Sequence, residues 1–194
     1  MENSLLVIAT GSSASLMLPS YLSEIRDQTK RSITVLMTAS TERFVRAEAI
    51  GWFADQVFTT TTPGVNPTEL ALRAEAIVVL PASGNTIASA ALGLMPTPAL
   101  TVLGAAPAPC LWFPHMNPVM WQKELMQRHV AALRERGEIV VEPIEAEVYE
   151  IWRGEIVPGI TTPGPEDAAT IVRDWLLART SSRLPAQTTA APAP

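Results

Sequence analysis

Short apolar runs, each ending in a cluster of small polar residues, recur along this chain and constrain its fold more than any other feature. Three of them, SLLVIATG (4–11), SITVLMT (32–38) and IVVLPAS (77–83), are apolar almost throughout instead of alternating with polar residues. Strands of this composition are buried on both faces of a sheet. Because segments with helical spacing lie between them, we predict an α/β fold with a doubly wound, mainly parallel sheet and helices on both faces.

The remaining elements follow the same alternation. A helix is predicted after the first strand, with Ser12 or Ser13 as its cap. The pattern predicts further helices over 41–55, 66–76, 84–95, 121–133 and 165–180, and further strands over 56–60, 99–105, 110–113 and 138–143.

Composition places these elements in one domain. A chain of 194 residues, 47% of them hydrophobic, is long enough for a single core, which we assign to residues 1–180. The Pro- and Ala-rich end, 181–194, has few large apolar residues and is predicted to be a flexible tail. A net charge of −5 without any basic run argues against nucleic-acid binding. The first apolar run is too short for a signal peptide or membrane span, and Glu2 precedes it, so we expect a cytoplasmic protein.

Residues that could ligate a metal or form disulfides are scarce. The single cysteine, Cys110, permits no intramolecular disulfide, and we expect it to be a small buried apolar residue. The two histidines, His115 and His129, do not have the spacing of helical metal ligands, and we expect no metal site.

Polar clusters follow the predicted strands and should meet at one edge of the sheet. Parallel strands place their carboxyl ends together, and ligands of such sheets bind there. The clusters are GSS (Gly11, Ser12, Ser13), TAST from Thr38 to Thr41, PASGNT (81–86) and PHMN (114–117). GSS and TAST could together hold a phosphate, although GSS is equally well read as an ordinary turn with a helix cap.

The third cluster suits the edge of a planar ring. Asn85 and Thr86 would lie in the first turn of their helix, where they could bond the polar edge of such a ring. Neither G-x-G-x-x-G nor G-x-x-x-x-G-K-[ST] occurs, so a mononucleotide is favoured over a dinucleotide or a nucleoside triphosphate.

Two of these clusters belong to longer motifs. PASGNTI (81–87) resembles the P-A-S/T-A-N-T-I motif, and PHMNPVMW (114–121) the P-x-M-N-x-x-M-W motif, of the flavin-containing cysteine decarboxylases. That family comprises the peptidyl-cysteine decarboxylases of lantibiotic-type biosynthesis and their relative phosphopantothenoylcysteine decarboxylase. The resemblance covers residues 5 to about 178 and implies a Rossmann-like or flavodoxin-like sheet.

The resemblance implies FMN as the cofactor. It places the phosphate near Gly11, Ser12, Ser13 and Ser40, and the ring near Phe44, Ala82, Ser83 and Asn85. The implied activity is oxidative decarboxylation of the C-terminal cysteine of a ribosomally made precursor peptide to an aminoenethiol, which can be built into an S-aminovinyl-cysteine ring.

Asn117 is implied at the substrate. Its amide could bond the departing carboxylate or the developing thioenolate, or it could cap the helix that begins at Pro118, and both roles can coexist. Further candidate substrate-binding residues are Met120, Tyr149, Trp152 and Thr162, and we expect residues 149–162 to form a mobile clamp over the peptide.

One position departs from the family pattern. The family histidine before the P-A-S motif is replaced by Pro67, in the stretch PTELA. Either His115 or the substrate itself takes over its role, or the chain binds FMN as a non-catalytic partner subunit. Phosphopantothenoylcysteine decarboxylase is a further alternative, disfavoured because no cysteine follows Cys110, and a flavin prenyltransferase is a third.

Family precedent implies a homo-oligomer, either a trimer or a dodecamer of four trimers. Trp52, Trp112 and Trp121 are candidates for its interfaces, but core packing is the role that we expect for each.

Overall fold

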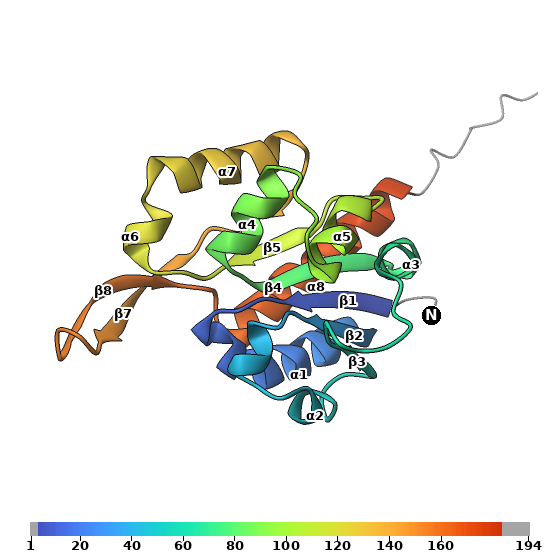
Figure 1. Ribbon diagram of the computed structural model, residues 1–194, viewed down its shortest axis with the longest axis horizontal. Helices are drawn as coiled ribbons and strands as arrows, with labels where there is room; N and C mark the ends of the chain where they lie inside the picture. The colour runs from blue at the N-terminus through green and yellow to red at the C-terminus, as the bar shows by residue number, and fades with distance from the viewer. Residues whose placement is uncertain (1–3, 184–194) are drawn as a thin grey trace, which may run out of the picture.

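The computed structural model describes residues 4–183, which form a six-stranded parallel sheet with helices on both faces and a separate two-stranded hairpin (Figure 1). The order across the sheet is β3-β2-β1-β4-β5-β6, the order typical of Rossmann sheets. Its strands are β1 Ser4–Ala9, β2 Ser32–Met37, β3 Gln56–Phe58, β4 Ala76–Ala82, β5 Leu111–Pro114 and β6 Ile139–Val140. The predicted doubly wound fold is therefore confirmed.

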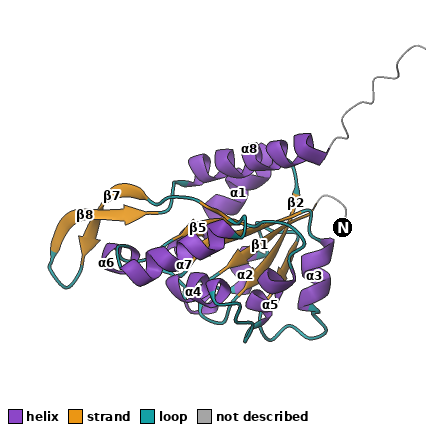
Figure 2. Cartoon of the chain, turned by 90° about the horizontal axis from the view of Figure 1, so that it is seen from above, coloured by secondary structure: helices purple, strands orange, loops and turns teal. Residues whose placement is uncertain are grey.

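The sheet separates two hydrophobic cores, because successive side chains of each strand point to opposite faces. Leu5 and Val7 belong to one core and Leu6 and Ile8 to the other, and all four side chains are buried. Two helices, α1 Leu18–Thr29 and α8 Pro165–Arg183, cover the first face (Figure 2). The second face is covered by α3 Pro67–Arg73, α4 Gly84–Ala91, α5 Pro98–Ala105 and α7 Glu124–Glu135.

Two predicted segments have a different structure. Residues 99–105 were predicted as a strand but lie in helix α5, because Thr97 caps the helix by accepting a hydrogen bond from the Leu100 N–H at 3.3 Å and Pro98 occupies its first turn. The predicted helix over 41–55 is reduced to the 3-10 turn η2 Thr41–Arg43 and the single turn α2 Ala47–Ile50, separated by extended backbone at Arg46.

The hairpin was not predicted as a pair of strands. It consists of β7 Ile144–Glu150 and β8 Glu155–Thr161, which pair antiparallel from Ile144↔Thr161 to Glu150↔Glu155. The two strands project from the molecule beside the short helix α6 Pro118–Trp121 (Figures 1 and 2).

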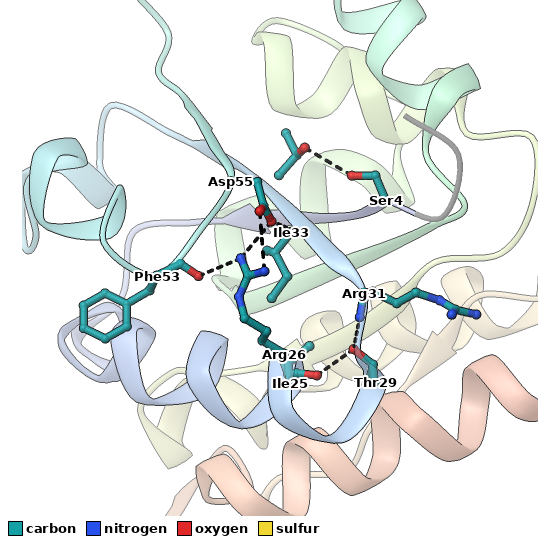
Figure 3. Close-up of polar contacts among 9 residues, drawn as sticks. Ser4, Ile25, Arg26, Thr29, Arg31, Ile33, Phe53 and Asp55 are labelled. Carbon is teal, nitrogen blue, oxygen red and sulfur yellow. Dashed lines mark hydrogen bonds and ion pairs between the residues drawn. The ribbon is translucent and has the colours of Figure 1, made fainter.

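Asp55 ties the chain before β3 to helix α1 and strand β2 (Figure 3). Its carboxylate accepts hydrogen bonds from the Ile33 backbone N–H at 2.6 Å and from Arg26 Nη2 at 2.7 Å. Arg26 Nη2 also donates to the Phe53 carbonyl at 3.3 Å. The hydrogen bond from Arg26 lowers the pKa of the Asp55 carboxyl below its usual value.

The remaining predictions concern the burial of Cys110 and of three tryptophans, and the C-terminal end of the chain. Cys110 and Trp112 are buried as predicted, and Trp121 is half-buried against the second core, but Trp52 is 87% exposed, so core packing was the wrong prediction for it. Helix α8 extends past residue 180 to Arg183, and the rest of the predicted tail, 184–194, lies outside the described residues. Within residues 4–183, no helix is both long and apolar enough to cross a bilayer.

Candidate active site

A cavity of about 520 Å³ opens where the strands β1, β2, β4 and β5 end. Its size is within the range of about 300–1,000 Å³ that is usual for small-molecule and cofactor sites. Four polar clusters predicted to converge do so here: the lining residues are Gly11, Ser12, Ser13, Thr38, Ala39, Ser40, Thr60, Ser83, Gly84, Asn85, Thr86, Thr97, Ala99, Leu100, His115, Met116, Asn117 and Met120.

One end of the cavity is formed by the loops after β1 and β2, which touch. A Cβ built on Gly11 would lie 2.3 Å from the Ser40 Cβ, so no larger residue than glycine fits between these loops as they stand. The contact brings the hydroxyls of Ser12, Ser13 and Ser40 to one side of the cavity. Such a group of hydroxyl and backbone donors suits a phosphate.

Ser12 was predicted as a candidate helix cap, together with Ser13, but neither caps α1. The segment after β1 is the 3-10 turn η1 Ser13–Met17, and the N-cap of α1 is Met17. The Ser12 Oγ is buried and has no hydrogen-bond partner among the described residues. Because a buried hydroxyl without a partner costs free energy, its position against the cavity indicates a hydrogen bond to a ligand.

Threonine side chains behind the cavity hold these loops to the sheet. The Thr10 hydroxyl donates to the Pro81 carbonyl at 2.8 Å and accepts from the Ser83 N–H at 2.8 Å, which joins the ends of β1 and β4. The Thr41 hydroxyl donates to the Ala9 carbonyl at 2.6 Å and thus joins the loop after β2 to β1. The cavity wall is therefore fixed by buried hydrogen bonds.

The first turn of helix α4 forms another part of the cavity wall. The Ser83 side chain caps this helix by accepting from the Thr86 N–H at 3.4 Å, and the Ser83 and Thr86 hydroxyls are 3.0 Å apart. Asn85 also lines the cavity and is exposed. The predicted position of Asn85 and Thr86 in the first helical turn is confirmed.

Asn117 has the helix-capping geometry that was predicted as one of its two roles. Its Oδ1 accepts a hydrogen bond from the Val119 N–H at 2.9 Å, and Pro118 follows as the first residue of α6. The cap uses the amide oxygen only. None of the described residues accepts a hydrogen bond from Nδ2, which leaves this donor for a ligand in the cavity.

His115 lies in the turn between β5 and Asn117. Its backbone N–H donates to the Ala82 carbonyl at 3.0 Å, and the preceding carbonyl, that of Pro114, accepts from the Thr162 hydroxyl at 2.9 Å. The side chain is half-buried, and burial lowers the pKa of the imidazole below its usual value of 6.5. At neutral pH the ring is therefore uncharged and has one nitrogen free to accept a proton.

Five predicted site residues do not line the cavity. Ala82 is fully buried and contributes its carbonyl to the position of His115, and Thr162 is buried with its hydroxyl on Pro114. Phe44 closes the turn η2 and is partly exposed; Tyr149 and Trp152, which are 64% and 69% exposed, lie on the hairpin.

The structure also shows why proline is acceptable at position 67. Pro67 is the first residue of α3, and the Asn66 side chain caps this helix through the N–H groups of Thr68 at 3.0 Å and Glu69 at 3.2 Å. Proline is favoured in the first turn of a helix, where its missing N–H has no helical partner. Pro67 does not line the cavity.

The cavity contains residues that the sequence patterns did not indicate. Thr60 follows β3, an edge strand after which no site was predicted, and its place in the run TTTT (59–62) was the available signal. Thr97, Ala99 and Leu100 come from the start of α5, and they were missed because this segment was predicted as a strand.

No group of three or more His, Cys, Asp or Glu side chains suitable for a metal ion occurs within residues 4–183.

A Rossmann-type sheet with a hydroxyl-lined cavity at its carboxyl edge is typical of nucleotide-binding α/β proteins. Comparison with known proteins gives the family. The model of the Flavoprotein family matches residues 1–162, and the chain therefore belongs to that family.

Named relatives and solved structures agree with this assignment. Mersacidin decarboxylase from a Bacillus species is 31% identical over 169 residues, which are 84% of this chain and 86% of the relative. Epidermin decarboxylase from Staphylococcus epidermidis is 28% identical over 173 residues, 89% of this chain and 95% of the relative. A point variant of the peptidyl-cysteine decarboxylase EpiD in complex with the substrate peptide DSYTC has a TM-score of 0.81 at 27% identity, with 91% of this chain and 99% of that chain covered.

Proposed function

We propose that this protein is an FMN-dependent enzyme that oxidatively decarboxylates the C-terminal cysteine of a precursor peptide to an aminoenethiol. Membership of the Flavoprotein family and similarity to mersacidin and epidermin decarboxylases support the cofactor and the reaction. The observation that carries the proposal is one cavity that brings together both sequence motifs and the loops after β1 and β2.

The residues present fit FMN. The unpartnered Ser12 hydroxyl, with Ser13, Thr38 and Ser40, would hold the phosphate, and Asn85, Thr86 and the Ser83 loop would lie at the ring. Bound FMN supplies a two-electron acceptor for oxidation of the cysteine side chain.

Asn117 would act on the substrate. The thioaldehyde formed by oxidation accepts the electron pair released when CO₂ leaves, and negative charge builds up on sulfur. A donor held ready near this charge lowers the barrier. The Asn117 Nδ2 is suited to this role, because the helix cap holds the amide in place through its oxygen.

The β7–β8 hairpin is the proposed peptide clamp. Residues 149–162 include its outer half, where the side chains of Tyr149, Ile151, Trp152 and Ile156 are exposed. Exposed apolar side chains that are grouped on one element favour contact with a partner. Thr162, at the base of the hairpin, would act by fixing the turn that carries His115.

Purified protein with bound flavin and a short peptide ending in cysteine provides the test. Mass spectrometry should show loss of CO₂ and two hydrogens from the peptide. Asn117→Ala should retain the flavin spectrum and lose at least about 10²-fold in rate, as expected for a donor to developing charge. A peptide that is unchanged under air by FMN-loaded protein would instead favour a non-catalytic FMN-binding subunit.

Two finer features are part of the proposal. Exposed large apolar side chains outside the hairpin, with Trp52 the most exposed, favour a homo-oligomer, and light scattering should give a trimer or a dodecamer. Phosphopantothenoylcysteine is the less favoured substrate: the coenzyme A biosynthesis bifunctional protein of Mycobacterium tuberculosis is 32% identical over 125 residues, only 30% of that relative.

A further inference from the structure

We propose that His115 is the proton acceptor for the substrate thiol. This assignment rests on the proposed function and deepens it by naming the acid-base group of the same cavity. Oxidation of the cysteine side chain releases one proton from its thiol, so the cavity needs a group that accepts this proton.

His115 is the only ionisable side chain among the described residues that line the cavity. The other lining residues are glycine, alanine, leucine, methionine, serine, threonine and asparagine. Serine and threonine hydroxyls and asparagine amides donate and accept hydrogen bonds but do not take up an additional proton at neutral pH. Any proton that a side chain of this wall takes from the substrate therefore goes to the imidazole.

The proposed oxidation step needs a proton acceptor near the substrate thiol. Conversion of R–CH₂–SH to R–CH=S removes a hydride from carbon, for which bound FMN would be the acceptor, and a proton from sulfur. A free thiol has a pKa of about 8.5, so only a few per cent is thiolate at pH 7. After CO₂ leaves, sulfur carries the negative charge and takes a proton back to give the enethiol. One imidazole that accepts the first proton and returns the second balances both steps.

The surroundings of His115 suit this exchange. The turn is fixed on both sides, by the bond from its own N–H to the Ala82 carbonyl at 3.0 Å and by the bond from Thr162 to the Pro114 carbonyl at 2.9 Å. Asn117, two residues further on, places its amide in the same cavity. Acceptor and charge-stabilising donor thus come from one rigid turn.

No charged partner holds the imidazole in its protonated form. Burial lowers the pKa of His115 and outweighs its own backbone hydrogen bond, which raises it, and no charged side chain contributes to the shift. The neutral ring that a proton acceptor must have is therefore the main form at pH 7.

The test compares FMN-loaded wild type with His115→Asn and with His129→Asn, which changes a half-buried histidine outside the cavity. Peptide turnover is measured by mass spectrometry from pH 5 to 8, and bound FMN by absorbance. Loss of the base should slow His115→Asn by about 10²–10⁴-fold with FMN still bound, while His129→Asn keeps the wild-type rate.

Two readouts distinguish a proton acceptor from a structural residue. In FMN-loaded wild type without peptide, an NMR titration of the His115 ring should give a pKa below 6.5 that coincides with the acid limb of kcat/KM, because this limb reports the enzyme free of substrate. Imidazole in solution should restore turnover to His115→Ala. If His115→Asn does not fold, His115→Gln and this rescue take its place.

The outcomes separate the two proposals. Wild type without turnover overturns the proposed function and this assignment with it. Wild-type turnover together with a His115→Asn variant that keeps the rate and the acid limb overturns the assignment alone.

Discussion

The contact between Gly11 and Ser40 predicts the effect of one methyl group. In Gly11→Ala the new Cβ would lie 2.3 Å from the Ser40 Cβ, about 0.7 Å short of the 3.0 Å below which real Cβ contacts are essentially never found. The nearest atom is a Cβ next to the backbone, and the Ser40 backbone lies at 3.1 and 3.2 Å, so no rotamer change relieves the clash and the two loops must separate.

Overpacking of this kind costs about 1–3 kcal/mol of unfolding free energy. The same movement of about 0.7 Å would displace the Ser40 hydroxyl from Ser12 and Ser13, so FMN affinity should fall by at least about 10-fold, the equivalent of one hydrogen bond of about 1.4 kcal/mol. Urea unfolding of the FMN-free protein and FMN titration by fluorescence measure the two effects separately.

Gly51→Ala is the matched control. Its new Cβ would meet only the Glu48 and Ala47 carbonyls, at 3.4 and 3.7 Å, and its φ of −59° is open to alanine. Gly51→Ala should therefore stabilise the protein by about 0.4–1 kcal/mol and leave FMN binding unchanged. A Gly11→Ala variant with wild-type stability and FMN affinity would refute the proposed closeness of the two loops.

Three further predictions concern other contacts. Ser12→Ala should bind FMN about 10-fold more weakly without loss of stability, because its buried hydroxyl has no protein partner; equal affinity by titration would contradict its assignment to the phosphate. Glu138→Ala should lower the free energy of unfolding, measured in urea, by about 2–4 kcal/mol, because the Cys110 N–H and the Trp112 Nε1 lose the carboxylate acceptor that lies 2.8 Å from each. Glu138→Gln, which keeps an acceptor oxygen, should cost less. Asp55→Asn should lower the free energy of unfolding by roughly 1 kcal/mol at pH 7, a value discounted because the ion pair is partly exposed. The folded-state pKa of Asp55 is lowered, so wild type loses this stabilisation as the carboxyl is protonated, and the difference from the variant should shrink below about pH 4. Thermal unfolding at pH 7 and pH 3 would show this change.

Those parts of the fold that depend on continuous apolar runs could be predicted from the sequence. Both ends of strands β1, β2 and β4 lie within two residues of the predicted limits, because polar residues bound each buried apolar run. The same patterns located the clusters at the strand ends, and parallel pairing brought them together.

Prediction failed where a few residues or a contact distant in sequence decide the structure. An apolar run of seven residues, 99–105, suits a strand or a buried helix equally, and the Thr97 cap with Pro98 selects the helix. The pairing of β7 with β8 joins residues as far apart as Ile144 and Thr161, a register that no local pattern fixes. Phe44 does not line the cavity; it closes the turn η2, which stands where the start of a continuous helix was expected.

Ser12 shows what sequence and structure add to each other. Its position before a helical pattern suggested a cap or a phosphate ligand with equal weight. Only the structure shows that α1 begins at Leu18, six residues after Ser12, and that the Ser12 hydroxyl is buried without a partner, which favours the role of phosphate ligand.

The wall of hydroxyl and amide groups around the cavity has a consequence for handling the protein. None of the described lining residues is lysine or arginine, so a phosphate held there is bound by short neutral hydrogen bonds instead of ion pairs. Dissolved ions screen interactions between exposed charges but compete poorly with buried hydrogen bonds. Bound flavin should therefore survive purification in molar sodium chloride, and its dissociation constant should change little with ionic strength.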